Sequence, residues 1–540
     1  MNIEIKKPRI IYNDDTGVLR SIPPPHVPGM LARAVDYLKG GQVDCVCWCF
    51  STGNSALSYR SNVLENTFDN QNKDKGFSTN NNSNSKNLIF SLYKRGIDYL
   101  PQLINLYHEA GISFCASFRM NDAHHKSRPN GSLSSKFWLE HQDLRLWEVS
   151  DGISYYNATM DFSYPELRKL RLNSIAEVCE KYDIDGIELD FCRNPYTFQP
   201  SEAWAKKDIL TDFISEVKNK ILDIADKKRT NIKLLVRVPF DANRRKNAGM
   251  DINTWVETKI VDILIMSNLF DDYSEDKIGY YQDFCRKNDV LFYPSIEFEP
   301  LTNCKPDYFL PDGNSAPKPN YRTLFSAQDI ILGARAMAKS FYAQGAQGVY
   351  LFNYPCKLFE VKRTFHDFMD MKEVINELGS LKSLEGKNRK YYLWNSLPVY
   401  IEAMRPAEYH QTIEFNIAEK EIEPNSTVIV KFIREASDNP HSYQESNKDL
   451  APGYIDTYLN SRKLDDRKFK IKYSEAASID SGFKIGKHEI IEIELEGTMI
   501  NCGKNTLAFH IPHLPTEVSP YIYIYELSLT VVADKNYMPE

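Results

Sequence analysis

Short apolar runs alternate with helix-like segments along the first part of the chain. Eight runs have the length of buried strands and occupy residues 9–14, 43–50, 112–119, 184–191, 232–239, 261–268, 290–297 and 347–354. Amphipathic segments such as residues 96–111 and 164–182 lie between them. Pro165 marks the start of one of these segments, and Gly111 follows the periodic part of another. This alternation predicts an α/β fold, a (β/α)8 TIM barrel.

The loop lengths indicate which end of this barrel carries a site. The segments after the second, third and seventh runs are long, at residues 51–95, 120–163 and 298–326, whereas the connections from helix to next strand are short. All three long segments leave the carboxyl ends of strands, where barrel enzymes build their sites. We therefore expect a walled pocket at that end.

After Gly386 the pattern changes to alternating apolar and polar positions separated by turns, as in "QTIEFNIA" and "NTLAFHI". Such short alternating strands are typical of an antiparallel β-sandwich, here jelly-roll-like. We therefore expect two domains, a (β/α)8 barrel of residues 1–385 and an accessory β-sandwich of residues 386–540.

Composition and charge exclude two classes of partner. The formal net charge of -7 argues against nucleic acid, because phosphate binding needs a concentrated basic surface. No stretch is long and apolar enough to span a membrane. The N-terminus "MNIEIKKPRIIYNDD" has no apolar signal segment. We expect a soluble chain, cytoplasmic as given, or periplasmic or secreted if a signal peptide has been removed.

The ten cysteines show no paired spacing typical of zinc sites. In "CVCWCF" alternation puts Cys45, Cys47 and Cys49 on one side of a strand, and neighbours on one strand are poor disulfide partners. We expect small buried thiols and a reducing compartment.

The fourth run, "DGIELDF" at residues 185–191, carries two carboxylates on one side. Every second residue from Ile187 to Phe191 is apolar and suits the helix side, so Glu188 and Asp190 face inward. Asp190 lies at the mouth and Glu188 one layer below. The same alternation places further polar side chains at the mouth: Arg119, Asn121, Arg237, Asn268, Glu297, Glu299 and Asn353. A purely structural barrel would fill this layer with branched apolar side chains.

Carboxylates from separate strands that face one pocket suit the hydrolysis of a glycosidic bond. One protonates the leaving oxygen, and the other attacks the sugar or activates water. Asp190 and Glu297 form the best pair at the mouth, with Glu188 in reserve. Glu188 is equally suited to a buried ion pair with Arg119 or Arg237.

The motif "DGIELDF" resembles the fourth-strand motif of TIM-barrel glycoside hydrolases in the α-amylase and α-glucosidase clans, which ends in the nucleophilic aspartate. This resemblance implies that Asp190 is the nucleophile. The wider set "IIYNDD", "FRMNDAHH", "DGIELDF", "VDILIMSN" and "GVYLFNY" resembles the glycosyl-hydrolase-like family ten group over most of residues 8–380. Retaining β-glycosidases end their fourth strand in Asn-Glu, whereas Phe191 follows Asp190 here. From that clan only the seventh-strand carboxylate, Glu297, is carried over.

Polar residues after the first and third runs are candidates for substrate contacts. Asp122, His124 and His125 have metal-ligating side chains but no spaced partner, so hydrogen bonds to sugar hydroxyls, above all from Asp122 and His125, suit them better. Asp14, at the end of the first run, either contacts substrate or caps a turn.

Aromatic and basic residues extend this candidate site. Four aromatic residues either stack on pyranose rings or pack in the core: Trp48, Trp138, Trp147 and Tyr155. Three arginines lie at or near the mouth: Arg119, Arg193 and Arg237. A neutral sugar does not need so many positive charges, which favours an acidic or sulfated glycan. Pairing of these arginines with Glu188 and Asp190 is the alternative.

The sequence thus predicts a glycosidase that cleaves an oligo- or polysaccharide by a two-carboxylate mechanism with retention, without a cofactor or a bound metal. One rival is a catalytically inert barrel that binds a glycan. The other is a metal-dependent hydrolase or lyase that uses the cluster at residues 122–125. The expected partner is a carbohydrate, the β-sandwich either binds glycan or has a structural role, and the oligomeric state is left open.

Overall fold

The fold is seen in a computed structural model, which describes residues 4–20, 22, 25–52, 59–64, 66, 88–123, 134–147, 158–267, 277–297, 327–353, 372–392, 399–402, 409–435, 456–474, 488–511 and 521–533. The chain divides into two compact units, which we treat one at a time. The barrel unit comprises Met1–Asp271, Lys277–Glu297 and Gly345–Ser380, and the sandwich unit comprises Asp272–Asp276, Phe298–Gln344 and Leu381–Glu540. The predicted domain boundary after residue 385 stays a prediction.

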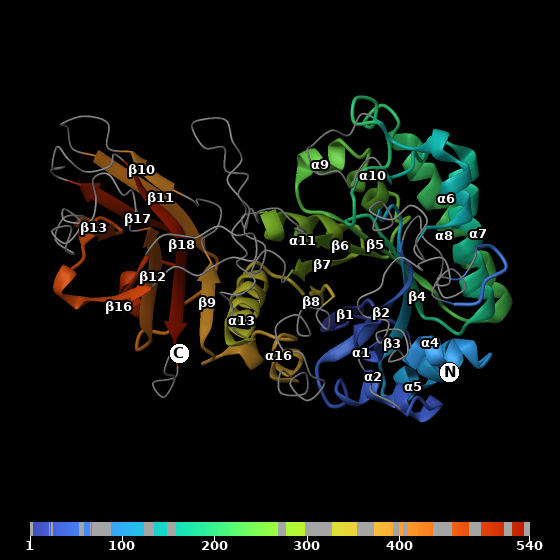
Figure 1. Cartoon of the computed structure of the whole chain (residues 1–540), viewed down its shortest axis with the longest axis horizontal. Coiled ribbons are helices and arrows are strands. Elements are labelled where there is room, and N and C mark those ends of the chain that lie inside the picture. The colour runs from blue at the N-terminus through green and yellow to red at the C-terminus, as the bar shows by residue number, and fades with distance from the viewer. Residues whose placement is uncertain are drawn as a thin grey trace. The chain divides into compact units, whose positions relative to one another are not determined.

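Eight parallel strands close into a barrel in chain order, which confirms the predicted fold class (Figure 1). The strands are β1 (Ile10–Asp14), β2 (Val43–Thr52), β3 (Ser113–Arg119), β4 (Gly186–Asp190), β5 (Lys233–Pro239), β6 (Ile263–Ser267), β7 (Leu291–Ile296) and β8 (Val349–Leu351). The pairing of β1 with β8, in which Ile10 lies opposite Val349, closes the ring.

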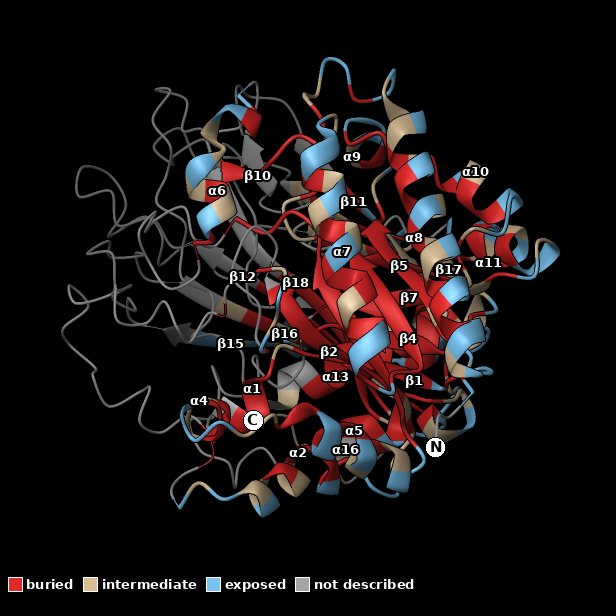
Figure 2. Cartoon of the chain, turned by 90° about the vertical axis from the view of Figure 1, so that its right-hand side faces the viewer, coloured by how far each residue is buried: buried red, intermediate tan, exposed pale blue. Residues whose placement is uncertain are grey.

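Helices cover the outside of this barrel. They are α1 (Gly17–Arg20), α2 (Arg33–Asp36), α4 (Leu88–Lys94), α5 (Leu100–Glu109), α6 (Lys136–Glu140), α7 (Pro165–Lys181), α8 (Lys207–Lys228), α9 (Ala242–Lys246), α10 (Ile252–Glu257), α11 (Ile278–Lys287) and α16 (Lys372–Glu377). Short 3-10 helices of the barrel unit lie at Pro28–Ala32 and Gln142–Leu144, and another, at Lys382–Leu384, belongs to the sandwich unit. Figure 2 shows buried strands inside and helices such as α7 and α8 with one buried and one exposed face. In α8 the buried residues recur every three or four positions, as Leu210, Ile214 and Val217 do.

The barrel interior is a separate apolar cluster of inward-facing side chains. It includes Ile11, Leu235, Ile263 and Ile265 together with several cysteines. Among the described residues every free cysteine except Cys502 is buried, as the sequence predicted. Because the lower layers of the barrel are filled in this way, a polar site has room only towards the carboxyl ends of the strands.

The sandwich unit contains two antiparallel sheets. One has the order β10-β18-β12-β16-β15 with β9 on β18, and the other has the order β11-β17-β13-β14. Their bounds are β9 (Arg389–Tyr392), β10 (Val399–Glu402), β11 (Tyr409–Ile417), β12 (Thr427–Glu435), β13 (Asp456–Leu459), β14 (Arg462–Lys463), β15 (Phe469–Ser474), β16 (His488–Glu496), β17 (Gly503–Ile511) and β18 (Tyr521–Val532). Short 3-10 helices lie at Asp466–Lys468 and Gly497–Met499. Phe432 and Phe509, from different sheets, pack edge to face with ring centroids 5.3 Å apart, so one apolar core joins the sheets.

Helix α13 (Ala327–Ala343) belongs to the sandwich unit and packs against β9. A charged cluster anchors it there. Lys339 contacts Glu419 at 3.1 Å and Glu423 at 2.8 Å, and Arg389 donates to the same two carboxylates at 2.7 and 2.8 Å. These two cations lower the pKa of Glu423 to about 2, although its partial burial acts in the opposite direction. None of the described helices is long and apolar enough to cross a membrane.

The closure of the barrel depends on a residue without a side chain. A Cβ at Gly348 would lie 2.6 Å from the carbonyl oxygens of Pro8 and Arg9 and 2.7 Å from the Tyr293 ring. We expect Gly348→Ala to lower the free energy of unfolding by about 2 kcal/mol or more, because backbone atoms must move apart. Gly29→Ala is the matched control, since no atom lies within 4 Å of the added carbon. Urea unfolding of both variants measures this difference, and equal stabilities would contradict it.

Candidate active site

Arg237 lies at the centre of the polar end of the barrel. It comes from β5 and its side chain is fully buried. Its Nη1 donates to Asp190 Oδ2 at 2.9 Å, and its Nη2 donates to Glu297 Oε1 at 2.7 Å. The guanidinium carbon lies 3.7 Å from the centroid of the Phe352 ring. Burial alone would lower the pKa of Arg237, but the charges of Asp190 and Glu297 raise it well above its usual value.

Hydroxyl groups fix the carboxylate of Glu297, which follows β7. Ser295 donates to Glu297 Oε1 at 2.7 Å, and Ser267 from β6 donates to the same oxygen. Ser267 also accepts two hydrogen bonds from Arg237, at 3.1 and 2.7 Å. Both serines escaped the sequence analysis, although Ser295 shares the strand face of Glu297. Oε1 of Glu297 therefore has three donors, an arrangement that stabilises a carboxylate.

Glu188 differs from its neighbours on this surface. Its Oε1 accepts a 2.6 Å hydrogen bond from Tyr350 on β8, and its side chain is fully buried one layer below Asp190. Burial, followed by the nearby charge of Asp190, raises the pKa of Glu188 to about 7. Asp190, in contrast, is bound by Arg237 and by the Cys192 amide, which donates to Oδ1 at 2.9 Å.

A second arginine joins the ends of β1 and β3. Arg119 donates to Asp122 Oδ2 at 3.1 Å and to Asp15 Oδ2. Its guanidinium carbon lies 5.8 Å from the centroid of the Phe352 ring, which therefore contacts both arginines. Arg119 and Arg237 are thus engaged with carboxylates of the chain itself, but only the pair of Arg237 with Asp190 belongs to the pairing alternative drawn from the sequence.

Several buried oxygens near the strand ends have no hydrogen-bond partner among the described residues. They belong to Asp15 (Oδ1), Glu188 (Oε2), Glu297 (Oε2) and Asn353 (Oδ1). A buried polar atom without a partner costs about 1–3 kcal/mol, so such atoms mark a place where a ligand or ordered water completes the network. Those of Asp15, Glu297 and Asn353 are acceptors, which match the hydroxyl donors of a carbohydrate.

Other predicted substrate residues have structural roles or different positions. Trp48 is fully buried against Tyr107 and Phe114, with centroids 6.5 and 6.4 Å away, so it follows the core-packing alternative. Asn121 uses its amide to bind Met160 and Tyr196 backbone groups at 2.6 to 2.9 Å.

Asp14 and Asn353 lie at the ends of neighbouring strands. Asp14 accepts from the Gly17 amide at 2.8 Å and thereby caps the following turn. The strand alternation predicts an inward-facing Asn353, but the inward-facing residues are Tyr350 and Phe352, so the predicted phase is one residue off. Asn353 lies beyond β8 with φ at 47°. Its backbone amide donates to the Asn13 side chain at 3.2 Å.

Of the remaining candidates, Arg193 is half-buried just beyond β4. Trp138 is buried and donates to the Ala158 carbonyl at 2.9 Å, whereas Trp147 is 60% exposed with Arg145 4.6 Å above its ring. The following predicted residues lie outside the described part of the chain: His124, His125, Tyr155, Asn268 and Glu299. Of the three residues of the rival metal cluster, Asp122, His124 and His125, the described part of the chain contains Asp122 alone.

Comparison with known proteins gives a family resemblance. Residues 85–282 match the family model described as Glycosyl hydrolase-like 10. This stretch contains β3 to β6 and therefore carries Glu188, Asp190 and Arg237. The match confirms, over these residues, the resemblance drawn from the sequence. A comparison with curated proteins finds no match.

Solved structures give distant matches. A noncanonic maltogenic α-amylase, AmyB, from Thermotoga neapolitana has a TM-score of 0.34 and 9% identity over 94% of this chain and 99% of that one. An endo-β-1,4-mannanase from Thermotoga petrophila has a TM-score of 0.36 and 9% identity, over 96% and 97% of the two chains. A family 27 β-L-arabinopyranosidase from Geobacillus stearothermophilus has a TM-score of 0.33 and 12% identity, over 95% and 98%. Scores this low carry no argument about chemistry, and the barrel assignment rests on the strand pairing.

The raised pKa of Glu188 makes the stability of the protein depend on pH. Between its ordinary value of 4.5 and about 7, the folded protein keeps a proton that the unfolded chain has lost. The contribution of Glu188 to folding stability is complete below pH 4.5, and it is lost as the pH rises through about 7. This loss of folding stability amounts to on the order of 3 kcal/mol. We expect it to be absent in Glu188→Gln, because glutamine cannot ionise. The variant should be more stable than the wild type above the upper value.

Chemical unfolding at acidic and at mildly alkaline pH measures this difference. Glu216→Gln, an exposed position on α8, is the matched control and should retain the wild-type pH slope. A wild-type slope in Glu188→Gln would show that Glu188 is ionised in the folded protein at neutral pH.

Proposed function

We propose that this barrel is a glycosidase that cleaves an O-glycosidic bond of an oligo- or polysaccharide by a two-carboxylate, retaining mechanism. The observation that carries the proposal is the meeting of three carboxyl groups in different electrostatic environments. Asp190 and Glu297 bind the same arginine, whereas Glu188 has a pKa of about 7. Titratable groups separated in this way supply an acid and a base at one pH.

Asp190 has the properties of the nucleophile. Both of its oxygens accept hydrogen bonds, from Arg237 and from the Cys192 amide, which hold the carboxyl group in one orientation. It ends β4, at the position where the resemblance drawn from "DGIELDF" implies the nucleophile. In this role its carboxylate attacks the anomeric carbon and forms a covalent glycosyl-enzyme, which water then hydrolyses.

Glu188 is the better proton donor, in place of Glu297. A general acid must hold its proton near the working pH, and burial favours this form of Glu188. Glu297 instead has three donors on Oε1 and balances the charge of Arg237. Glu188 and Asp190 lie two residues apart on one face of β4, about 7 Å between Cα atoms. This spacing suits the carboxyl separation of about 5 Å in retaining enzymes.

The charge of the site bears on the substrate. Arg119 and Arg237, two of the three arginines behind the acidic or sulfated glycan, are engaged with carboxylates of the chain. An acidic or sulfated substrate therefore loses two of the three arginines that favoured it. The buried acceptor oxygen of Glu297 fits a neutral, hydroxyl-rich sugar better.

A barrel that binds a glycan without cleaving it is the second candidate. One observation favours it: Arg237 joins Asp190 to Glu297, which is also how a structural ion-pair network is built. The two candidates differ in what the loss of Asp190 does. If Asp190 is a nucleophile, its replacement by asparagine removes turnover and leaves the protein folded. If Asp190 is part of a structural ion pair, the same replacement lowers the stability of the protein.

Turnover of a panel of aryl glycosides and oligosaccharides tests the proposal. We expect Asp190→Asn and Glu188→Gln each to lower kcat/KM at least about 100-fold, because each removes a reacting group. Asp212→Asn, at an exposed position on α8, is the matched control and should retain full activity. Thermal unfolding is measured beside turnover. Wild-type turnover in Asp190→Asn would remove Asp190 from the role of nucleophile. A wild type that is inactive on every substrate but binds glycan would favour the second candidate.

The pH profile of kcat/KM tests the role of Glu188. Since the pKa of Glu188 is about 7, activity that needs its protonated form should fall above that pH. Asp212→Asn, the exposed control on α8, should leave this alkaline limb in place. A profile without an alkaline limb near neutral pH would remove Glu188 from the role of acid.

A further inference from the structure

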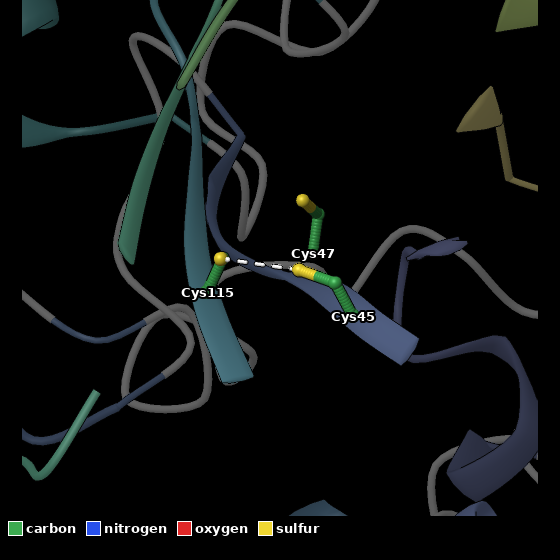
Figure 3. A group of neighbouring side chains, drawn as sticks. All are labelled: Cys45, Cys47 and Cys115. Carbon is green, nitrogen blue, oxygen red and sulfur yellow. Dashed lines mark hydrogen bonds between the residues drawn. The ribbon is translucent and has the colours of Figure 1, made fainter. Parts of the chain in front are cut away.

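Three thiols meet inside the barrel, on the strands β2 and β3. Cys45 and Cys47 come from β2, and Cys115 comes from β3 directly opposite Cys47. Figure 3 shows the Cys45 and Cys115 sulfurs turned towards each other, with the Cys47 sulfur beside them. The Cys45 and Cys115 sulfurs are 3.5 Å apart, and all three lie within 4.8 Å of one another. The proposed hydrolysis uses none of these residues.

The sulfurs have the spacing of a three-coordinate metal site. A metal–sulfur bond of about 2.3 Å places three sulfurs in a plane roughly 4 Å from each other. The observed separations, from 3.5 Å up to 4.8 Å, include this value. Small rotations about the Cα–Cβ bonds therefore suffice to bring the three sulfurs onto one ion.

The surroundings select the kind of ion. All three cysteines are fully buried, and Ile11, Leu235 and other apolar residues share their cluster. Hard ions such as Mg²⁺ keep water and need oxygen ligands, which this cluster does not offer. Among the described residues no fourth His, Cys, Asp or Glu joins the group, whereas structural zinc sites are almost always four-coordinate. Soft thiolates without a fourth ligand favour Cu(I).

The glycine of "DGIELDF" is part of this arrangement. A Cβ at Gly186 would lie 2.7 Å from Cys115 Sγ, so the absence of a side chain on β4 leaves the space that the thiol occupies.

We propose that Cys45, Cys47 and Cys115 form a buried three-thiolate site for one Cu(I) ion. Each thiol that ligates the ion releases its proton to solvent, and the oxidation state of copper does not change. The ion links β2 to β3 and thereby stabilises the folded barrel, since it binds the folded chain more tightly than the unfolded one. Because the cluster is fully buried, the ion enters as the chain folds or when the barrel opens locally.

Metal content and stability of the full chain test this proposal. The wild type and its variants are expressed in copper-supplemented medium, purified with a thiol reductant and analysed by elemental mass spectrometry. We expect one copper per chain in the wild type and a loss of at least tenfold in Cys115→Ser and Cys47→Ser. Cys285→Ser, at another buried cysteine, is the matched control and should retain the copper.

A second readout separates metal binding from misfolding. Anaerobic titration of the reduced, folded protein with Cu(I) should raise the Tm of the wild type and of Cys285→Ser and leave that of Cys115→Ser unchanged. Circular dichroism verifies that each variant is folded. A wild type without stoichiometric copper would overturn the proposal, as would equal binding by Cys115→Ser. Retention of Zn²⁺ in place of copper, in zinc-supplemented medium and in competition, would overturn the choice of ion.

Discussion

The buried charge of Arg237 is the constraint on which the polar end of the barrel depends. A guanidinium group without water is costly by several kcal/mol unless carboxylates and hydroxyls compensate it. Asp190, Glu297 and Ser267 do so, from three different strands. The strand ends are therefore tied to one another through a single side chain. Among the described residues, Arg237 donates no hydrogen bond to Glu188. Burial therefore dominates the environment of Glu188 and raises its pKa.

The sequence predicted the barrel and the inward face of β4 because both depend on local alternation. Two-residue periodicity decides the side of a strand, and Asp190, Glu297 and Arg237 are all where this rule puts them. The same rule contained a signal against Trp48. Since Cys45, Cys47 and Cys49 were assigned to one side of the strand, Trp48 had to face the other, where it packs against Tyr107.

The rule fails where strands end and where partners must be chosen. For Asn353 the phase was assigned one residue out, because the inward face of this short strand belongs to Tyr350 and Phe352. Asn121 follows β3 and binds backbone groups from distant loops, which no local pattern encodes. Ser267 is visible in the sequence as a small polar residue. Its hydrogen bonds with Arg237 depend on the register between β5 and β6, and register is set by the whole sheet.

The ring of Phe352 lies against both Arg119 and Arg237, at 5.8 and 3.7 Å from their guanidinium carbons. A side chain shared by two cations makes their energies interdependent, because a shift of the ring alters both contacts at once. The ends of β3, β5 and β8 then respond as one mechanical unit. The effects of substituting the two arginines are therefore coupled through one aromatic side chain.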